Sequence, residues 1–255
     1  MRQEISKMLA TKLRPNFTGT REPNDHAENR LLAALSRKDF RLLLPDIELV
    51  ALPIGEILYR CGDVIRYVYF PVDSVVSLLS EVENDRSTLE VGVVGNEGMT
   101  GIAVFLGVKK SRNQMIVQGA GTALRMKAAD LRKHANVSGG RLQFLLQLYT
   151  HALLTQISQS AACNRFHLVE ARLARWLLAM RDRIGTSEFR LTQEFLSNML
   201  GVRREMVNKA AGTLQKQELI TYTRGVLTIL DNAGLEAASC DCYRSIKEEY
   251  DNFLN

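Results

Sequence analysis

The chain has 255 residues, of which 46% are hydrophobic and 24% are charged, and its net charge is +5. This composition excludes a disordered or fibrous protein and leaves room for two ordinary domains. Four scattered cysteines suit a reducing compartment better than a disulfide scaffold. Neither a signal peptide nor an apolar run long enough for a membrane helix is visible. We therefore expect a cytoplasmic protein without membrane contact, whose charge is compatible with a nucleic-acid partner.

The first half of the chain predicts an arm, a helix and a β-roll. Residues 1–27 mix charged residues with proline and glycine, which indicates a flexible arm. Glu28–Leu44 has apolar residues at helical spacing. From Glu48 to Met126, short Val- and Ile-rich runs alternate with turn residues, which predicts an antiparallel, jelly-roll-like sensor domain over residues 28–136.

A long helix is predicted within residues 137–164, because Arg141–Asn164 contains neither proline nor glycine. One stripe of this helix advances by four and three residues in turn, which is the spacing of a coiled-coil seam. An ordinary amphipathic helix packed on its own domain fits the stripe nearly as well. The predicted dimer-interface residues are Leu142, Leu146, Tyr149, Leu153 and Gln156.

The chain then predicts a hinge at Asn164–His167 and a helix at Val169–Arg183. Leu191–Ala211 has the residue pattern of a helix-turn-helix. Thr192 can cap a first helix, and Gly201 permits the sharp turn before a second helix.

The second helix, starting near Arg203, is predicted to face DNA, since its exposed side chains can read base edges or meet phosphate. The alternative is a helical hairpin with solvated charges. Leu219–Ile229 indicates two strands joined at Arg224-Gly225, which makes the motif winged. The predicted DNA-binding residues are Thr192, Gln193, Arg203, Arg204, Glu205, Asn208, Lys209 and Arg224.

The C-terminal region is predicted to continue as one helix, Gly234–Phe253, in which acidic residues outnumber basic ones. Residues 165–255 are therefore assigned to a winged helix-turn-helix domain with a C-terminal helical extension. Together these elements define an α+β fold class.

A β-roll, a long helix and a winged helix-turn-helix, in this order over Glu28–Asp231, resemble the Crp/Fnr superfamily of bacterial regulators. The most specific match is Gly-Val-Arg-Arg-Glu-Met-Val-Asn-Lys at the recognition helix. The resemblance implies a homodimer joined along the long helix, bound to two-fold symmetric double-stranded DNA, with RNA polymerase as a further partner. It also implies that Arg204 and Glu205 read a G·C pair, and that Lys209 contacts a base or phosphate.

Two positions depart from the family's recognition helix. Arg203 stands where the family often has a capping Ser or Thr, and Met206 replaces a small hydroxyl residue. The target sequence is therefore not implied.

The sensor region also departs from the cyclic-nucleotide-binding members. Ile102 follows Gly101 where those members have Glu, and Asn113-Gln114, or Arg112 after a slip, stands where they have Arg. A buried phosphate needs a counter-charge. We therefore expect a small-molecule effector other than cyclic AMP, of unknown identity, near this degenerate cassette.

No metal or cofactor is predicted. No cysteine precedes Cys61, which argues against the N-terminal iron–sulfur site of oxygen-sensing members. Cys240 and Cys242 have no histidine close in sequence and make an incomplete site. A redox pair remains open, but plain buried thiols are the expectation.

No catalytic residue is predicted either, because the chain has no phosphate-binding loop, metal-ligand cluster or nucleophile motif. We expect a regulator rather than an enzyme. The alternative is a ligand-binding or protein-interaction module that has lost specific DNA binding.

Overall fold

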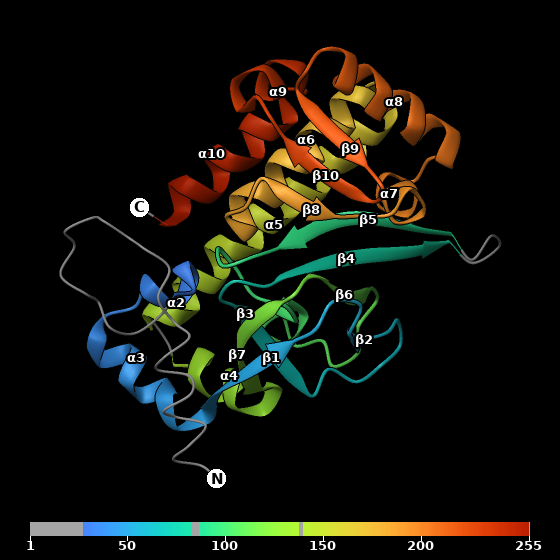
Figure 1. Cartoon of the computed structure of the whole chain (residues 1–255). Coiled ribbons are helices and arrows are strands. Elements are labelled where there is room, and N and C mark those ends of the chain that lie inside the picture. Colours follow the sequence, from blue (N-terminus) through green and yellow to red (C-terminus); the bar gives the residue numbers. More distant parts are fainter. Residues whose placement is uncertain (1–27, 83–86, 138–139, 255) are drawn as a thin grey trace, which may run out of the picture.

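The computed structural model describes residues 28–82, 87–137 and 140–254. In this part of the chain, strands form a roll and a mainly helical half lies against one side of it (Figure 1). This is the α+β architecture that the sequence predicts. The predicted arm at residues 1–27 lies outside the described residues.

The roll consists of two antiparallel sheets that enclose a common apolar core. Its strands are β1 (Ile47–Leu52), β2 (Ile57–Tyr59), β3 (Tyr67–Pro71), β4 (Val75–Val82), β5 (Ser87–Val94), β6 (Gln114–Gly119) and β7 (Gly121–Lys127). The sheet orders are β1-β7-β3 and β2-β6-β4-β5. β-Branched residues suit these pleated strands, and Val68 and Val76 are completely buried.

The predicted helix Glu28–Leu44 is divided into α2 (Arg30–Ala33) and α3 (Arg37–Leu43). The division occurs because the Ser36 hydroxyl accepts an amide hydrogen bond and so caps a new helix. Asn29 caps α2 and also donates hydrogen bonds to two backbone carbonyls of the roll. The N-terminal helices are thereby fixed to the roll.

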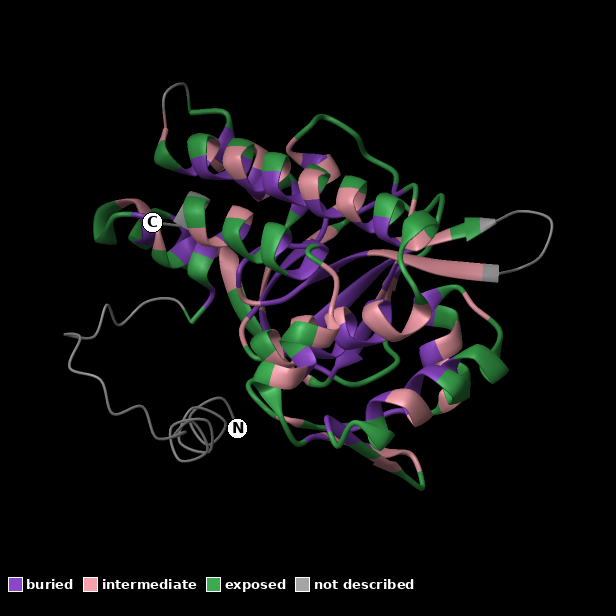
Figure 2. Ribbon diagram, turned by 90° about the horizontal axis from the view of Figure 1, so that it is seen from above, coloured by how far each residue is buried: buried purple, intermediate pink, exposed green. Residues whose placement is uncertain are grey.

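Two helices follow the roll, α4 (Ala128–Ala135) and the long α5 (Arg141–Phe166). Figure 2 shows α5 along one edge of the molecule, with buried residues facing inward and exposed residues facing outward. The inward face carries the predicted stripe of Leu142, Leu146, Tyr149, Leu153 and Gln156.

The assignment of this stripe to a dimer interface is wrong, because it is buried within its own chain. Leu146 and Tyr149 have no exposed surface, and the Tyr149 hydroxyl donates to the Met99 carbonyl at 2.7 Å. The Gln156 side-chain oxygen accepts from the Val93 amide at 3.0 Å. A coiled-coil seam and an intramolecular contact share the same spacing, and the structure has the intramolecular contact.

The second half of the chain packs around Trp176 and Leu177, in a second core that also includes Val75, Leu79 and Val93 of the roll. Its elements are α6 (Val169–Ile184), β8 (Glu188–Arg190), α7 (Gln193–Leu200), α8 (Arg204–Lys216), β9 (Ile220–Thr223) and β10 (Val226–Ile229). The three strands form a small antiparallel sheet in the order β8-β10-β9. The helix-turn-helix and its wing are therefore present as predicted.

The predicted C-terminal helix Gly234–Phe253 is also interrupted, giving α9 (Asn232–Ala238) and α10 (Cys242–Leu254). α10 lies along α5, and its Ile246 and Tyr250 enter the core of the roll. The C-terminal segment thus joins both halves of the molecule. No helix among the described residues is long and apolar enough to span a membrane.

Candidate DNA-binding surface and interdomain cavity

The turn between α7 and α8 has the geometry that the sequence predicts. The Thr192 hydroxyl accepts a hydrogen bond from the Phe195 amide at 3.1 Å and caps α7. Gly201 ends the helix with φ of +60°, a left-handed conformation that favours glycine. The Val202 amide then donates to the Ser197 carbonyl at 3.0 Å, which closes the turn.

Helix α8 presents the predicted recognition residues to solvent. Val207, Ala210 and Leu214 are buried against the rest of the domain. Arg203 precedes the helix and provides no side-chain cap, as expected for a residue that cannot accept a hydrogen bond. The exposed residues at its start are Arg203, Arg204, Glu205, Met206, Asn208 and Lys209.

The wing lies beside the start of α7. Arg224 and Gly225 both have positive φ, 51° and 80°, as a type I′ hairpin turn requires. The Leu191 amide donates to the Gly225 carbonyl at 2.8 Å, and the Tyr222 hydroxyl donates to the Leu191 carbonyl at 2.8 Å. These bonds place the exposed Arg224 next to Thr192.

The two helices also meet through their polar side chains, since Arg204 Nε donates to Gln193 Oε1 at 3.1 Å. The fold therefore brings the start of α7, the start of α8 and the wing into one surface. Residues 190–224 hold six basic side chains, all exposed, against three acidic ones. Such a surplus supplies the phosphate contacts on which DNA affinity depends.

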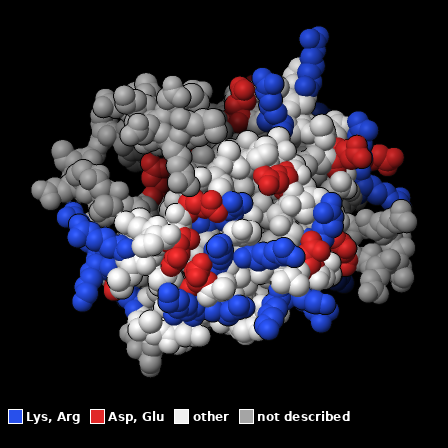
Figure 3. Space-filling model, turned by 90° about the horizontal axis from the view of Figure 1, so that it is seen from below, with Lys and Arg blue, Asp and Glu red and all other residues white. Residues whose placement is uncertain are grey.

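The face of the roll farthest from this domain has a different charge pattern. Figure 3, viewed from below, shows Lys and Arg side chains interspersed with Asp and Glu. An interspersed surface creates no extended field of one sign. The roll face is thus less suited to a polyanion than the α8 surface is.

Two buried polar contacts join the roll to α6. Trp176 Nε1 donates to Glu90 at 3.0 Å, and Arg183 Nε forms an ion pair with Glu97 at 2.8 Å. Burial raises the pKa of Glu90, and the Ser77 hydroxyl and nearby arginines only partly oppose this. Both contacts connect the roll with α6, the helix that precedes the helix-turn-helix.

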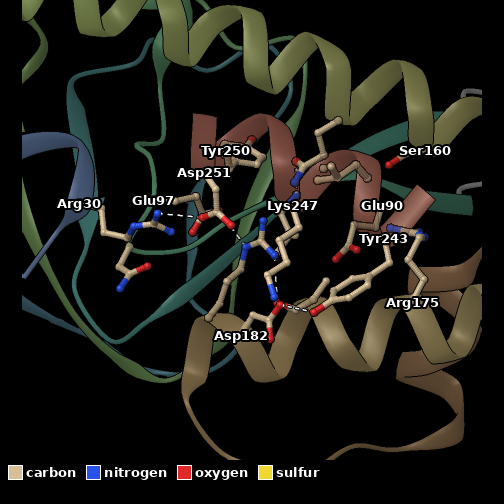
Figure 4. Close-up of a pocket in the computed structure, with 17 residues that line it drawn as sticks. Arg30, Glu90, Glu97, Ser160, Arg175, Asp182, Tyr243, Lys247, Tyr250 and Asp251 are labelled. Atoms are coloured by element: carbon tan, nitrogen blue, oxygen red, sulfur yellow. Dashed lines mark hydrogen bonds and ion pairs between the residues drawn. The ribbon is translucent and has the colours of Figure 1, made fainter. Parts of the chain in front are cut away.

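A cavity of about 290 Å³ lies between the roll, α6 and α10 (Figure 4). Its walls are strongly charged: Arg30 pairs with Asp251 at 3.0 Å, and the Tyr243 hydroxyl donates to Asp182 at 2.6 Å. Glu97 and Lys247 also line it. A small polar molecule could exchange contacts with these groups.

The degenerate cassette lies elsewhere. Gly101, with φ of +79°, starts a short 3-10 helix, Ile102–Val104, and the Ile102 side chain packs against the apolar core of the roll. Arg112 is exposed, whereas Asn113 and Gln114 are half-buried. Of the described residues that line the cavity, none comes from this cassette.

Solved structures with a similar fold include transcription regulators. Residues 171–238 match the family described as the Crp-like helix-turn-helix domain. A sequence search of curated proteins found no match.

The solved structure of FixK2 from Bradyrhizobium japonicum is similar, with a TM-score of 0.65 and 16% identity over 76% of this chain and 98% of that one. The c-di-GMP-responsive global regulator CLP of Xanthomonas campestris has a TM-score of 0.63 and 16% identity, over 77% and 100% of the two chains. A CRP-family transcriptional regulator from Thermus thermophilus has a TM-score of 0.61 and 18% identity, over 75% and 96%.

The matched segment contains the winged helix-turn-helix described above, which is the architecture of a DNA-binding domain. Residues 171–238 therefore belong to the Crp-like helix-turn-helix family, and the overall fold is similar to that of solved CRP-family regulators.

Several features of the DNA-binding half and of the interdomain cavity were not predicted from the sequence. Strand β8 has one buried residue, Phe189, between two exposed charged ones, a short alternation that could have been recognised. The cavity could not, because its walls come from separate segments spread between Arg30 and Asp251. The grouping of Cys240 and Cys242 with Cys163 and His167 was also missed.

Proposed function

We propose that this protein binds two-fold symmetric DNA operators as a homodimer and responds to a signal other than cyclic AMP. The observation that carries the proposal is the exposed start of α8, where Arg204 and Glu205 are open to solvent, as is the wing residue Arg224. Arg can bridge the O6 and N7 atoms of guanine, and Glu can accept from N4 of cytosine. This combination suits a G·C pair in the major groove.

The outward face of α5 is the surface that we assign to the dimer. Phe144 and Leu154 lie on it and are 48% and 59% exposed. Ala161 and Ala162 continue the same face toward the helix end and are also exposed. Two such faces can bury one another, which would set two α8 helices against successive major grooves about one helical turn apart.

The proposed signal is not recognised through a cyclic-nucleotide phosphate. Ile102 is packed in the roll core rather than offering a carboxylate to a ribose. The charged interdomain cavity is the better candidate for a small effector, because it is lined by roll, α6 and α10 residues together. Contact with RNA polymerase remains an expectation from the family resemblance.

Selection of bound sequences from a random DNA library tests the core of this proposal. The expected product is an inverted repeat with half-sites about 10 base pairs apart. Arg204→Ala should lower discrimination at one symmetric pair of positions by about 5- to 150-fold, the equivalent of about 1–3 kcal/mol. Arg41→Ala, an exposed arginine on α3, is the control.

Failure to enrich any sequence would favour the module that has lost DNA binding. If the Arg204→Ala variant recognises the enriched repeat as well as the unaltered protein does, the assigned base contact is refuted. Isothermal titration with cyclic AMP is expected to give no heat of binding, and micromolar binding would contradict the proposed signal.

A further inference from the structure

Three cysteines and a histidine meet at the hinge between the two halves of the molecule. Cys163 lies in the last turn of α5, and His167 follows that helix. Cys240 precedes α10, and Cys242 is its first residue. The four potential ligand atoms all lie within 4.8 Å of one another.

From this geometry we propose that Cys163, His167, Cys240 and Cys242 bind one zinc ion. Three thiolates and an imidazole form one of the tetrahedral ligand sets of structural zinc sites. In the sequence alone, Cys240 and Cys242 make an incomplete site, because no histidine is near them in the chain. The fold supplies both missing ligands from more than 70 residues away.

The distances fit a single ion. Cys163 Sγ is 3.5 Å from Cys240 Sγ, and Cys242 Sγ is 3.4 Å from His167 Nδ1. A tetrahedral ion with Zn–S bonds of about 2.3 Å holds its sulfurs about 3.8 Å apart. The thiols are all free, and a 3.5 Å separation is far longer than a disulfide bond. An iron–sulfur cluster divides its ligands among two or more irons and needs a wider set.

Local structure explains why these side chains converge. Residues four apart share one helix face, so Cys163 and His167 point the same way at the end of α5. The interruption between α9 and α10 then brings Cys240 and Cys242 to that face. Cys163 and Cys242 are buried, Cys240 is partly buried and His167 is exposed.

The surroundings suit an anionic metal centre. Three thiolates and a neutral imidazole around Zn²⁺ carry one net negative charge. Arg172 and Arg175 of α6 lie close enough to interact electrostatically with the thiols. Gln159 Nε2 lies 3.2 Å from Cys242 Sγ and can donate to it, as the outer partners of metal ligands commonly do.

The site would join two separate parts of the chain, the end of α5 and the start of α10. Zinc bound here fixes α10 against the end of α5, where the sensor half passes into the DNA-binding half. Arg172 also donates a hydrogen bond to the carbonyl of Leu200, the last residue of α7. Arg172, a positive charge close to the thiols, is therefore in direct contact with the helix-turn-helix.

Metal analysis of the full-length protein, expressed with zinc and purified without a metal-affinity tag, tests the proposal. We expect about one zinc per chain. Exchange with cobalt should give the visible absorption of a tetrahedral ion and a thiolate-to-cobalt charge-transfer band. Cys163→Ser and Cys242→Ser should each abolish these bands, and His167→Ala should shift them. Cys61→Ser, at an exposed cysteine of the roll, should retain both metal and spectrum.

A thiol titration of the unaltered protein gives a readout that needs no variant. One of the four cysteines, Cys61, should react at once, and the other three only after a chelator is added. A fully reduced protein that takes up neither zinc nor cobalt would overturn the proposal. So would metal retained by the Cys163→Ser/Cys242→Ser double variant, or an iron–sulfur chromophore at this site.

Discussion

The two faces of α5 should respond in opposite ways to mutation, and Leu146→Ala and Leu154→Glu test this. Leu146 has no exposed surface and lies on the face that packs on the roll, whereas Leu154 is 59% exposed on the outward face. If the outward face forms the dimer, the first change weakens folding and the second weakens association.

The magnitudes follow from burial. Truncating a fully buried leucine lowers the free energy of unfolding by about 2–5 kcal/mol. In a chain of this size each kcal/mol lowers the melting temperature by roughly 2–4 °C. A loss of about 3 kcal/mol therefore corresponds to roughly 6–12 °C for Leu146→Ala. Leu154→Glu adds a charge at an exposed site, where changes usually stay within about 0.5 kcal/mol of neutral for folding, but it places two like charges in an apolar dimer contact.

Light scattering coupled to size exclusion measures the mass, and thermal denaturation at several protein concentrations separates folding from association. We expect Leu146→Ala to remain dimeric with a lowered melting temperature, and Leu154→Glu to become monomeric while still folded. Ala129→Glu, an exposed alanine on α4, should change neither. A monomeric Leu146→Ala with an unchanged melting temperature would refute our reasoning and restore the buried stripe as the seam.

Three further outcomes follow from the site and the core. Lys209→Ala should weaken DNA binding and reduce the slope of log affinity against log salt by about 1, if Lys209 neutralises one phosphate; an unchanged slope measured by anisotropy would exclude that contact. Gly98→Ala should lower the melting temperature sharply, because its Cβ would clash with the edge of the Tyr149 ring, whereas Gly212→Ala, with nothing within 4 Å of the new Cβ, should not; equal melting temperatures would contradict this packing. Glu90 has a pKa raised by burial, so its contribution to stability is full in acid and is lost as pH rises through the folded-state pKa. Glu90→Gln should therefore gain thermal stability relative to the unaltered protein as the pH rises from about 4 to about 8, and a difference that does not vary with pH would argue against the raised pKa.

Local signals in the sequence were sufficient for most of the DNA-binding half. The turn at Gly201 and the hairpin at Arg224-Gly225 depend on backbone conformations that few residues adopt, so their identity indicates their position. The cap at Thr192 is equally local. For the same reason, Ser36 could have marked the interruption between α2 and α3.

Features that depend on distant partners could not be predicted from spacing. The stripe containing Leu146 and Tyr149 has one periodicity whether it meets the roll or a second subunit. The interruption at residues 239–241 contains neither proline nor glycine, and it is stabilised where Cys240 reaches Cys163 across the fold. The strands of the roll pair over long sequence separations, yet they were predictable as strands because their alternation is local.

The contacts that line the interdomain cavity are also contacts that hold the roll against α6. Glu90 and Glu97 belong to the roll, and Arg183 to α6. A charged ligand that enters the cavity must exchange interactions with these groups, so its binding free energy depends on how the halves are docked. By linkage, the docking then depends on the ligand to the same extent. A ligand that bound both arrangements equally would shift neither, so a signal read here has to be one that discriminates between the paired and unpaired forms of Arg183. The pH dependence expected at Glu90 probes the same interface, because Glu90 accepts a hydrogen bond from Trp176 of α6.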